Sequence, residues 1–407
     1  MSLHGRADTA GPMNGLPDEY AVRAGSMFDG FTMSGPATVY VRRGRIVAVD
    51  RTGSPPPDGH VVEPGADACL LPGLIDTHTH LAFDCGTNPV ESMAEAQDED
   101  LLSGMRAAAR TALLAGITTV RDLGARDFLA LTVARETLTT PDAGPEILAA
   151  GPPITTYGGH CHFMNGEAEG RDQLLGAVRE RHDRGCAVIK IMVSGGQMTP
   201  GSRSHVSQYG QDDLRIVVGE AHRLGLPVAA HAHNTEAIAH ALAAGVDTME
   251  HVSFSGENGI DEDAGLVARL GASGTFLSLT LGTHGTLPLE VQRHLRTRLD
   301  GRRKIHRALV ELGGRVVVGT DAGIFPSKPH DVLPYSVEEL KDLGLSPVAS
   351  LAAITSQAAA ACGVEGRKGR IRAGADADLL VIGGDPLRDP ACLRDVRAVF
   401  RAGVRVR

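Results

Sequence analysis

The feature that most constrains this chain is a lysine in the middle of an apolar strand. Lys190 is the only lysine in the first 300 residues, and it lies in the β-branched run Ala187–Val193. This pattern predicts a buried strand, where an ammonium group loses its hydration and the neutral amine is favoured. Either the amine reaches water from a strand end, or it takes part in chemistry. A neutral amine can react with CO₂, and the resulting carbamate could bridge two metal ions, so the second interpretation requires metal ligands elsewhere.

Two histidines follow the apolar run Leu71–Asp76. His78 and His80 are two residues apart, and on a strand this spacing turns both side chains to the same side, as two ligands of one metal require. Asp76 lies on that side as well. Alternate histidines alone are as often half-exposed surface residues, but the apolar run before them indicates the end of a buried strand.

Later apolar runs end in the same way. His231 and His233 follow Leu226–Ala230, His251 follows Gly245–Glu250, and Asp321 follows Gly314–Thr320. A single polar residue at a strand end is more often hydrogen-bonded than a ligand. The ordered series His-x-His, Lys, His, His, Asp, with each member on or just after a separate strand, predicts a metal site.

Strands and helices alternate along residues 71–363, which predicts a (β/α)8 TIM barrel of the α/β class. Residues 19–70 and 364–407 contain short strands broken by glycine, too few at either end for an independent core. We therefore expect one small β-sandwich domain built from both termini, after a flexible segment over residues 1–18. Active sites of such barrels lie where the strands end, so ligands far apart in sequence can meet. Lys190 lies deeper in its strand because its side chain is long.

On these residues the chain resembles the amidohydrolase superfamily, and within it the imidazolonepropionase-like and Xaa-Pro dipeptidase (prolidase-like) branch. The resemblance extends from about Tyr20 to the C-terminus. Besides the ligand series, four segments carry it: Gly116–Asp122, Gly158–His160, Lys190–Gly196 and Gly319–Gly323.

The resemblance implies two divalent metal ions, with zinc as the first candidate. The positions that match the family's metal ligands are His78, His80 and Asp321 for one ion and His231 and His251 for the other, while Lys190 matches the lysine whose CO₂-derived carbamate both ions share. It also implies attack by a metal-bridging hydroxide, with Asp321 as general acid and base. The spacing leaves open whether His231 or His233 is the fifth-strand ligand.

Other polar residues near the predicted strand ends are candidates for substrate contacts. His160 could polarise a substrate carbonyl as a catalytic residue or bind a carboxylate, although a histidine in a glycine-rich turn is as often solvated. His233 faces the same way as His231. Further candidates lie on loops, which usually carry specificity: Arg203, Tyr209 and His284. Cys161, next to His160, has no assigned role.

The predicted reaction is hydrolysis of an amide bond in a peptide or an N-acyl amino acid. One alternative is a mononuclear deaminase, which in this superfamily typically has a glutamate three residues after the fifth-strand histidine; Asn234 occupies that position. The others are hydrolysis of a cyclic amide (imidazolone-type) ring, a modified-peptide amidohydrolase of a biosynthetic pathway, and a non-catalytic scaffold. The complete ligand series argues against the scaffold.

Composition limits the partners of the chain. The net charge of −9 argues against a general nucleic-acid-binding protein, and no stretch of sequence has the character of a signal core or a membrane span. The six cysteines are scattered without a disulfide framework, which indicates a reduced, cytoplasmic protein. We expect a small-molecule or short-peptide substrate, and the sequence leaves open whether the chain forms a homo-oligomer.

Overall fold

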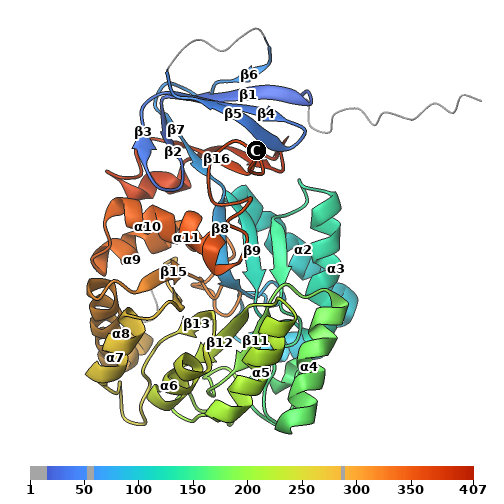
Figure 1. Cartoon of the computed structure of the whole chain (residues 1–407), viewed down its shortest axis with the longest axis vertical. Coiled ribbons are helices and arrows are strands. Elements are labelled where there is room, and N and C mark those ends of the chain that lie inside the picture. The colour runs from blue at the N-terminus through green and yellow to red at the C-terminus, as the bar shows by residue number, and fades with distance from the viewer. Residues whose placement is uncertain (1–15, 53–58, 286–288) are drawn as a thin grey trace, which may run out of the picture.

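The structure is a computed structural model that describes residues 16–52, 59–285 and 289–407. Small sheets lie at the top of Figure 1, and a larger body of strands and helices lies below them. The predicted flexible segment, residues 1–18, falls outside the described residues except for its last three positions.

Strands from both ends of the chain pair with one another in the upper part. They are β1 (Glu19–Ala24), β2 (Ser26–Phe28), β3 (Met33–Ser34), β4 (Ala37–Arg42), β5 (Arg45–Asp50), β6 (Val61–Val62), β7 (Ala68–Pro72), β16 (Leu379–Gly383), β17 (Val396–Arg401) and β18 (Val404–Arg405). One sheet has the order β5-β4-β1-β6 and the other the order β18-β17-β16-β7-β2-β3. Buried side chains of both sheets, such as Val39 and Phe400, belong to one hydrophobic cluster. The two ends of the chain therefore share a core.

The lower body holds eight parallel strands within the described residues. They are β8 (Leu74–Thr79), β9 (Ile117–Asp122), β10 (Glu146–Ala149), β11 (Ile189–Met192), β12 (Val228–Ala232), β13 (Thr248–His251), β14 (Phe276–Leu279) and β15 (Arg315–Val318). They form the sheets β10-β9-β8 and β11-β12-β13-β14-β15. Isolated parallel bridges join the two sheets on both sides, from Thr79 to Ala322 and from Ile154 to Ile191.

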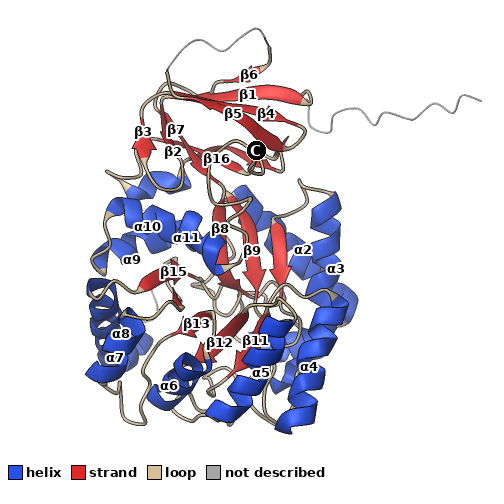
Figure 2. Cartoon of the chain, viewed as in Figure 1, coloured by secondary structure: helices blue, strands red, loops and turns tan. Residues whose placement is uncertain are grey.

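Helices lie on the outside of these strands (Figure 2). The α-helices are α1 (Pro89–Glu95), α2 (Asp98–Leu114), α3 (Leu129–Thr139), α4 (Gly170–Arg184), α5 (Gln211–Arg223), α6 (Thr235–Ala244), α7 (Ala264–Gly271), α8 (Leu289–Glu311), α9 (Ser336–Asp342), α10 (Pro347–Ala353) and α11 (Ser356–Ala361). Short 3₁₀ helices are η1 (Arg126–Phe128), η2 (His162–Met164), η3 (Leu333–Tyr335) and η4 (Pro390–Arg394). In the described part of the chain, none of the helices combines the length and the hydropathy that a bilayer crossing requires. The predicted α/β alternation is confirmed.

The register of the parallel strands sets the heights of the candidate site residues. Met192 lies opposite His231 and Lys190 opposite Ala229, so Lys190 is two residues deeper than His231. His251 lies opposite Ala232 on the next strand. The backbone of Lys190 thus lies deeper among the strands than that of the histidines. Its longer side chain needs this depth if the amine is to reach the same level as the imidazole rings.

Candidate metal centre

The first group of candidate ligands joins the ends of two strands. His78 lies at the end of β8, His80 directly follows that strand, and Asp321 follows β15. Nε2 of each histidine lies 3.4 Å from Oδ1 of Asp321, and one ligand atom from each residue falls within 4.8 Å of the others. Burial alone would raise the pKa of Asp321, but the two histidines hold it below its ordinary value. The carboxylate therefore stays ionised and can act as a ligand or accept a proton.

The second group consists of three histidines. His231 lies near the end of β12, His251 at the end of β13, and His233 just after β12, with one ligand atom from each within 4.8 Å of the others. Their ring centroids are 4.4 to 4.5 Å apart. Nδ1 of His251 lies 3.9 Å from Oδ2 of Asp321, so the two groups are neighbours. The geometry leaves both His231 and His233 as candidates for the fifth-strand ligand.

Two buried nitrogen atoms of the site lack a hydrogen-bond partner among the described residues. They are Nζ of Lys190, a residue that is 1% exposed, and Nε2 of His251. Burial lowers the pKa of Lys190 to about 8, although the charges of Glu250 and Asp321 oppose this shift. The neutral amine that carbamate formation requires is thus accessible. Imidazole and carboxylate ligands suit zinc and similar ions, so the residues present fit divalent metal ions.

Left-handed backbone conformations gather where the candidate ligands leave their strands. His251, Val252 and Asp321 have φ angles of 70°, 50° and 60°, a region that residues other than glycine rarely adopt. Cys161, beside His160, has a φ angle of 60°. Such conformations cost energy and concentrate at functional sites, so their placement agrees with a functional role for these strand ends.

A buried ion pair that the sequence analysis missed supports the first group. Glu250 on β13 contacts Nδ1 of His78 at 2.9 Å, and Arg121 on β9 donates to the other carboxylate oxygen at 3.0 Å. Burial would raise the pKa of Glu250, but Arg121 and His78 lower it to about 2. The ionised carboxylate accepts a hydrogen bond from the Nδ1–H group of His78, so the neutral ring carries no proton on Nε2, the nitrogen that faces Asp321. The sequence offered one signal for this pair, since Arg121 and Glu250 are charged residues that each lie within the sequence of a buried strand.

Asp76 holds the segment that leads to Asp321. Its carboxylate accepts hydrogen bonds from the backbone nitrogen of Thr320 at 2.9 Å and from the Thr320 hydroxyl at 2.6 Å. Asp76 therefore connects β8 to the end of β15, although it lies on the same side of its strand as His78.

His160 lies beside the second group. Its ring centroid is 4.8 Å from that of His231, and its Nδ1 is 2.9 Å from the hydroxyl oxygen of Thr199, on the loop after β11. Burial, together with the charge of His233, lowers the pKa of His160 to about 3, which favours the neutral imidazole. Burial raises the pKa of the neighbouring Cys161 thiol to about 12. The thiol therefore stays protonated, and the structure gives it no nucleophilic role.

Three further predicted substrate contacts are not joined to the histidine groups by any hydrogen bond or ring contact among the described residues. The hydroxyl of Tyr209 donates to the carbonyl of Ala168 at 2.7 Å, so it is already engaged. Arg203 is exposed on the loop after β11. His284 is also exposed, and its ring packs against Tyr335 at 5.1 Å. Their roles in substrate binding stay predictions.

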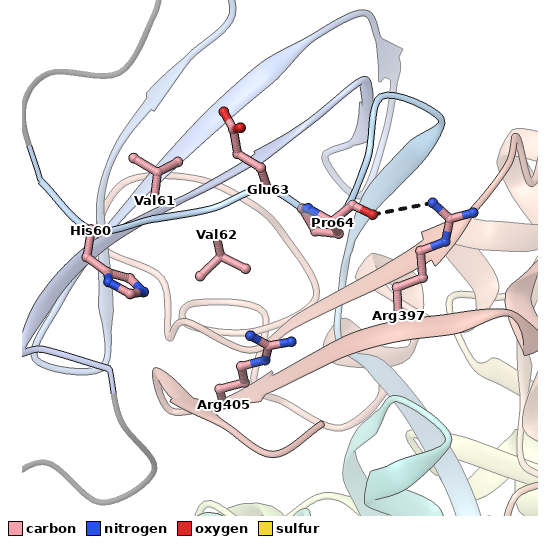
Figure 3. A pocket seen from close by; sticks show the side chains of 7 residues that line it. All are labelled: His60, Val61, Val62, Glu63, Pro64, Arg397 and Arg405. Carbon is pink, nitrogen blue, oxygen red and sulfur yellow. Dashed lines mark hydrogen bonds between the residues drawn. The ribbon is translucent and has the colours of Figure 1, made fainter.

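A separate pocket lies between β6 and the last strands of the chain (Figure 3). Arg397 and Arg405 line it together with His60. Both terminal guanidinium nitrogens of Arg397 already bind the carboxylate of Asp67, each at 2.6 Å. The pocket contains none of the candidate metal ligands and is therefore not part of this site.

Comparison with known proteins decides the family. The model of the amidohydrolase family matches residues 69–406, which is most of the chain. This chain belongs to the amidohydrolase family. The resemblance predicted from the sequence is confirmed, and the protein is a hydrolase of this family.

Several known proteins are similar to this amidohydrolase. Ochratoxinase of Aspergillus niger is 26% identical over 370 residues, which cover 81% of this chain and 73% of that enzyme. Imidazolonepropionase of Rubrobacter xylanophilus is 26% identical over 392 residues, covering 85% of this chain and 84% of that one. The crystal structure of a Xaa-Pro dipeptidase with methionine bound in its active site has a TM-score of 0.83 at 24% identity, covering 95% of this chain and 99% of that one. The structural likeness shows that this amidohydrolase and the dipeptidase have the same fold.

Proposed function

We propose that this amidohydrolase cleaves an amide bond with two divalent metal ions bound at the strand ends. The observation that carries the proposal is the adjacency of two three-residue ligand groups, together with a buried lysine amine that lacks a partner among the described residues. A mononuclear enzyme needs only one such group, and a non-catalytic scaffold needs neither. The pairing of two groups therefore favours a binuclear hydrolase.

The ligands divide between the two ions as the two groups suggest. His78, His80 and Asp321 would hold one ion, and His231 and His251 the other, with His233 as the alternative to His231. Lys190, converted to its carbamate by CO₂, would be shared by both. When bound, the ions would lower the pKa of a water molecule from about 15.7 to about 7 and polarise the scissile carbonyl.

Asp321 moves the proton in the proposed reaction. Its ionised carboxylate accepts a proton from the attacking water as the water oxygen bonds to the amide carbon. It then donates that proton to the leaving nitrogen as the C–N bond breaks. The products are a carboxylic acid and an amine, and the Asp321 carboxylate is restored for the next turnover.

His160 and His233 border the same space and are proposed to bind the substrate. Both lie beside His231, since the ring centroid of each lies within 4.8 Å of that of His231. A carboxylate or carbonyl next to the scissile amide would meet their N–H groups. The similarity to a Xaa-Pro dipeptidase favours dipeptides and N-acyl amino acids, and the similarity to imidazolonepropionase makes a cyclic amide the alternative.

The proposal includes the architecture that would hold this site together. The eight parallel strands and the bridges on both sides of their sheets support one closed (β/α)8 barrel over residues 71–363. The shared hydrophobic cluster of the terminal sheets supports one β-sandwich domain made of residues 19–70 and 364–407.

Asn234 weakens the case for a deaminase. Its side-chain oxygen accepts a hydrogen bond from the backbone nitrogen of Ala237 at 2.7 Å and so caps the start of α6. The position where such deaminases typically have a glutamate is thus occupied by a helix cap, and an amide side chain cannot transfer protons as a carboxylate does.

Activity screening tests the proposed function. The full chain, loaded with Zn²⁺ and bicarbonate, would be assayed against Xaa-Pro and other dipeptides, N-acyl amino acids, cyclic amides and a panel of aminated heterocycles. We expect release of a free amine and a carboxylic acid from at least one amide class. Release of ammonia from the heterocycles alone would favour the deaminase, and no turnover of any amide by the loaded protein would contradict the proposal.

Variants of the two proposed substrate histidines test which residues bind metal and which bind substrate. His160→Ala and His233→Ala should each raise KM or lower kcat/KM, because they remove hydrogen-bonding groups beside the ions, and the metal content should stay at that of the wild type. Elemental analysis and steady-state kinetics measure both. If His233→Ala lost metal and kept its affinity for substrate, His233 rather than His231 would be the fifth-strand ligand.

A further inference from the structure

Thr199 connects the loop after β11 to the loop that carries His160. Its Oγ1 lies 2.9 Å from Nδ1 of His160 and also accepts a hydrogen bond of 2.9 Å from the backbone nitrogen of Cys161. Thr199 is 1% exposed. Its hydroxyl group therefore has to satisfy its hydrogen-bonding capacity within the protein.

The burial of Thr199 fixes the direction of its hydrogen bond to His160. The backbone N–H of Cys161 can only donate, so the hydroxyl oxygen accepts there. The hydroxyl hydrogen also needs an acceptor, because buried polar groups are rarely left without a partner. Two acceptors lie beside Oγ1, namely Nδ1 of His160 at 2.9 Å and Sγ of Cys161, and sulfur is the weaker acceptor of the two. The hydroxyl therefore donates to Nδ1, and the one N–H of the neutral imidazole lies at Nε2.

The opposite edge of the His160 ring lies against the backbone of Gly196. A Cβ atom at Gly196 would come within 2.3 Å of Nε2 and 2.4 Å of Cε1 of His160, so a residue with a side chain would displace the ring. Within the described part of the chain Nε2 has no hydrogen-bond partner. The ring is thus held at Nδ1 and lies close to His231, and the missing side chain at Gly196 leaves room for its Nε2 edge.

We propose that Thr199 is a positioning residue that holds His160 as its Nε2–H tautomer, so that His160 donates a hydrogen bond to the substrate. This inference rests on the proposed function, which puts His160 beside the substrate. It gives a reason for the acceptor, a carbonyl or carboxylate oxygen, that the proposed function places beside His160, and it disfavours an ammonium group there. Thr199 would act only through His160.

The tautomer can be measured without substrate. Long-range ¹H–¹⁵N spectra of the full chain, labelled in histidine, distinguish the two nitrogens of each ring, and His160→Ala assigns the signals of His160. We expect the Nε2–H tautomer in the wild type and in Thr199→Ser, which keeps the hydroxyl group. Thr199→Val keeps the shape but removes the donor, and we expect this variant to lose the fixed tautomer. A wild-type His160 that carries its proton on Nδ1 would overturn the proposal.

A double-mutant cycle tests whether Thr199 acts through His160. With the best amide substrate of the screening panel, Thr199→Val should lower kcat/KM by about tenfold, the effect of one hydrogen bond, and Thr199→Ser should stay close to the wild type. In the His160→Ala background, Thr199→Val should have no further effect. Equal losses in both backgrounds would overturn the positioning role. If His160→Ala alone left kcat/KM unchanged, donation to the substrate would be wrong, while the spectra would still decide the tautomer.

Discussion

Single residues in this site differ in whether their polar atoms have partners within the described chain. Nζ of Lys190 and Nε2 of His251 are buried and have none, whereas Glu250 and Asp76 accept hydrogen bonds that hold neighbouring segments in place. Leaving a buried nitrogen unpaired is costly. The cost is understandable where the atom serves as a ligand or reacts, which is the role that we propose for these two residues. Glu250 and Asp76 instead support neighbouring segments of the site.

Replacement of Asp321 by asparagine separates its proposed catalytic role from a structural one. Asp321→Asn keeps the shape and one oxygen but cannot take up a proton at neutral pH. A general base typically contributes about 10²- to 10⁴-fold, so we expect kcat to fall by about that factor while the midpoint of thermal unfolding changes little. Steady-state kinetics and circular dichroism measure the two effects. A variant that kept most of its kcat would show that another group accepts the proton.

At the scale of elements, the Arg121–Glu250 pair ties β9 to β13 inside the body of strands. Neither side chain is more than 1% exposed, and Arg121 also donates to the backbone oxygen of Thr77 on β8 at 2.7 Å. The removal of one partner from such a pair leaves the other charge buried and uncompensated. The net contribution of the intact pair to the free energy of unfolding can be small, but the loss of one partner is costly. The pair therefore helps to keep three strands in register.

Arg121→Met should destabilise the protein by about 3–5 kcal/mol, because it leaves the Glu250 carboxylate buried without its cation. The matched control is Arg106→Met. Arg106 pairs with Glu136 at 2.8 Å but is 42% exposed, and exposed pairs contribute only about 0–1 kcal/mol. The free energies of unfolding would be measured in urea. Equal effects of the two substitutions would contradict the assignment of a buried ion pair.

The sequence was informative where a functional residue ends an apolar strand. His78, His80, His231, His251 and Asp321 could be selected in this way, and Lys190 because it lies in the middle of such a strand. The structure brings the histidines and Asp321 together, and the role of all six as ligands stays a prediction. Arg121 and Glu250 were missed because they pair across strands far apart in sequence. Thr199 was missed because its partner is set by how two loops meet. Tyr209 was selected from its loop, but the direction of its hydroxyl depends on packing against Ala168.

At the scale of the whole molecule, a cluster of charges connects the strand body to the terminal sheets. Glu146 lies on β10, and Lys368 binds it at 3.1 Å. Lys368 also pairs with Asp378, which directly precedes β16. Lys368 is 3% exposed and Glu146 12%. The Glu146–Lys368 contact joins residues more than two hundred positions apart, and together with the Lys368–Asp378 contact it links the two parts of the fold.

Protonation of the Glu146 carboxylate should lower the free energy of unfolding in acid. Burial would raise the pKa of Glu146, but Arg367 and Lys368 lower it from 4.5 to about 2. A carboxylate whose pKa is lowered in the folded state stabilises the protein above its unfolded-state pKa, and this stabilisation is lost as the pH falls toward the folded-state value. In Glu146→Gln, the decrease in unfolding free energy between about pH 5 and about pH 3 should be smaller than in the wild type. An unchanged decrease would mean that other carboxylates cause it.

The metal content of Lys190→Ala tests the proposed binuclear centre most directly. After loading with Zn²⁺ and bicarbonate, the wild-type chain should contain about two ions, as a two-metal hydrolase requires. Lys190→Ala should lose at least one ion together with its activity, because no carbamate can form, and added short carboxylic acids should restore both in part. Elemental analysis of the two proteins, prepared side by side, measures this. Two ions and full activity in Lys190→Ala would contradict a lysine-bridged centre.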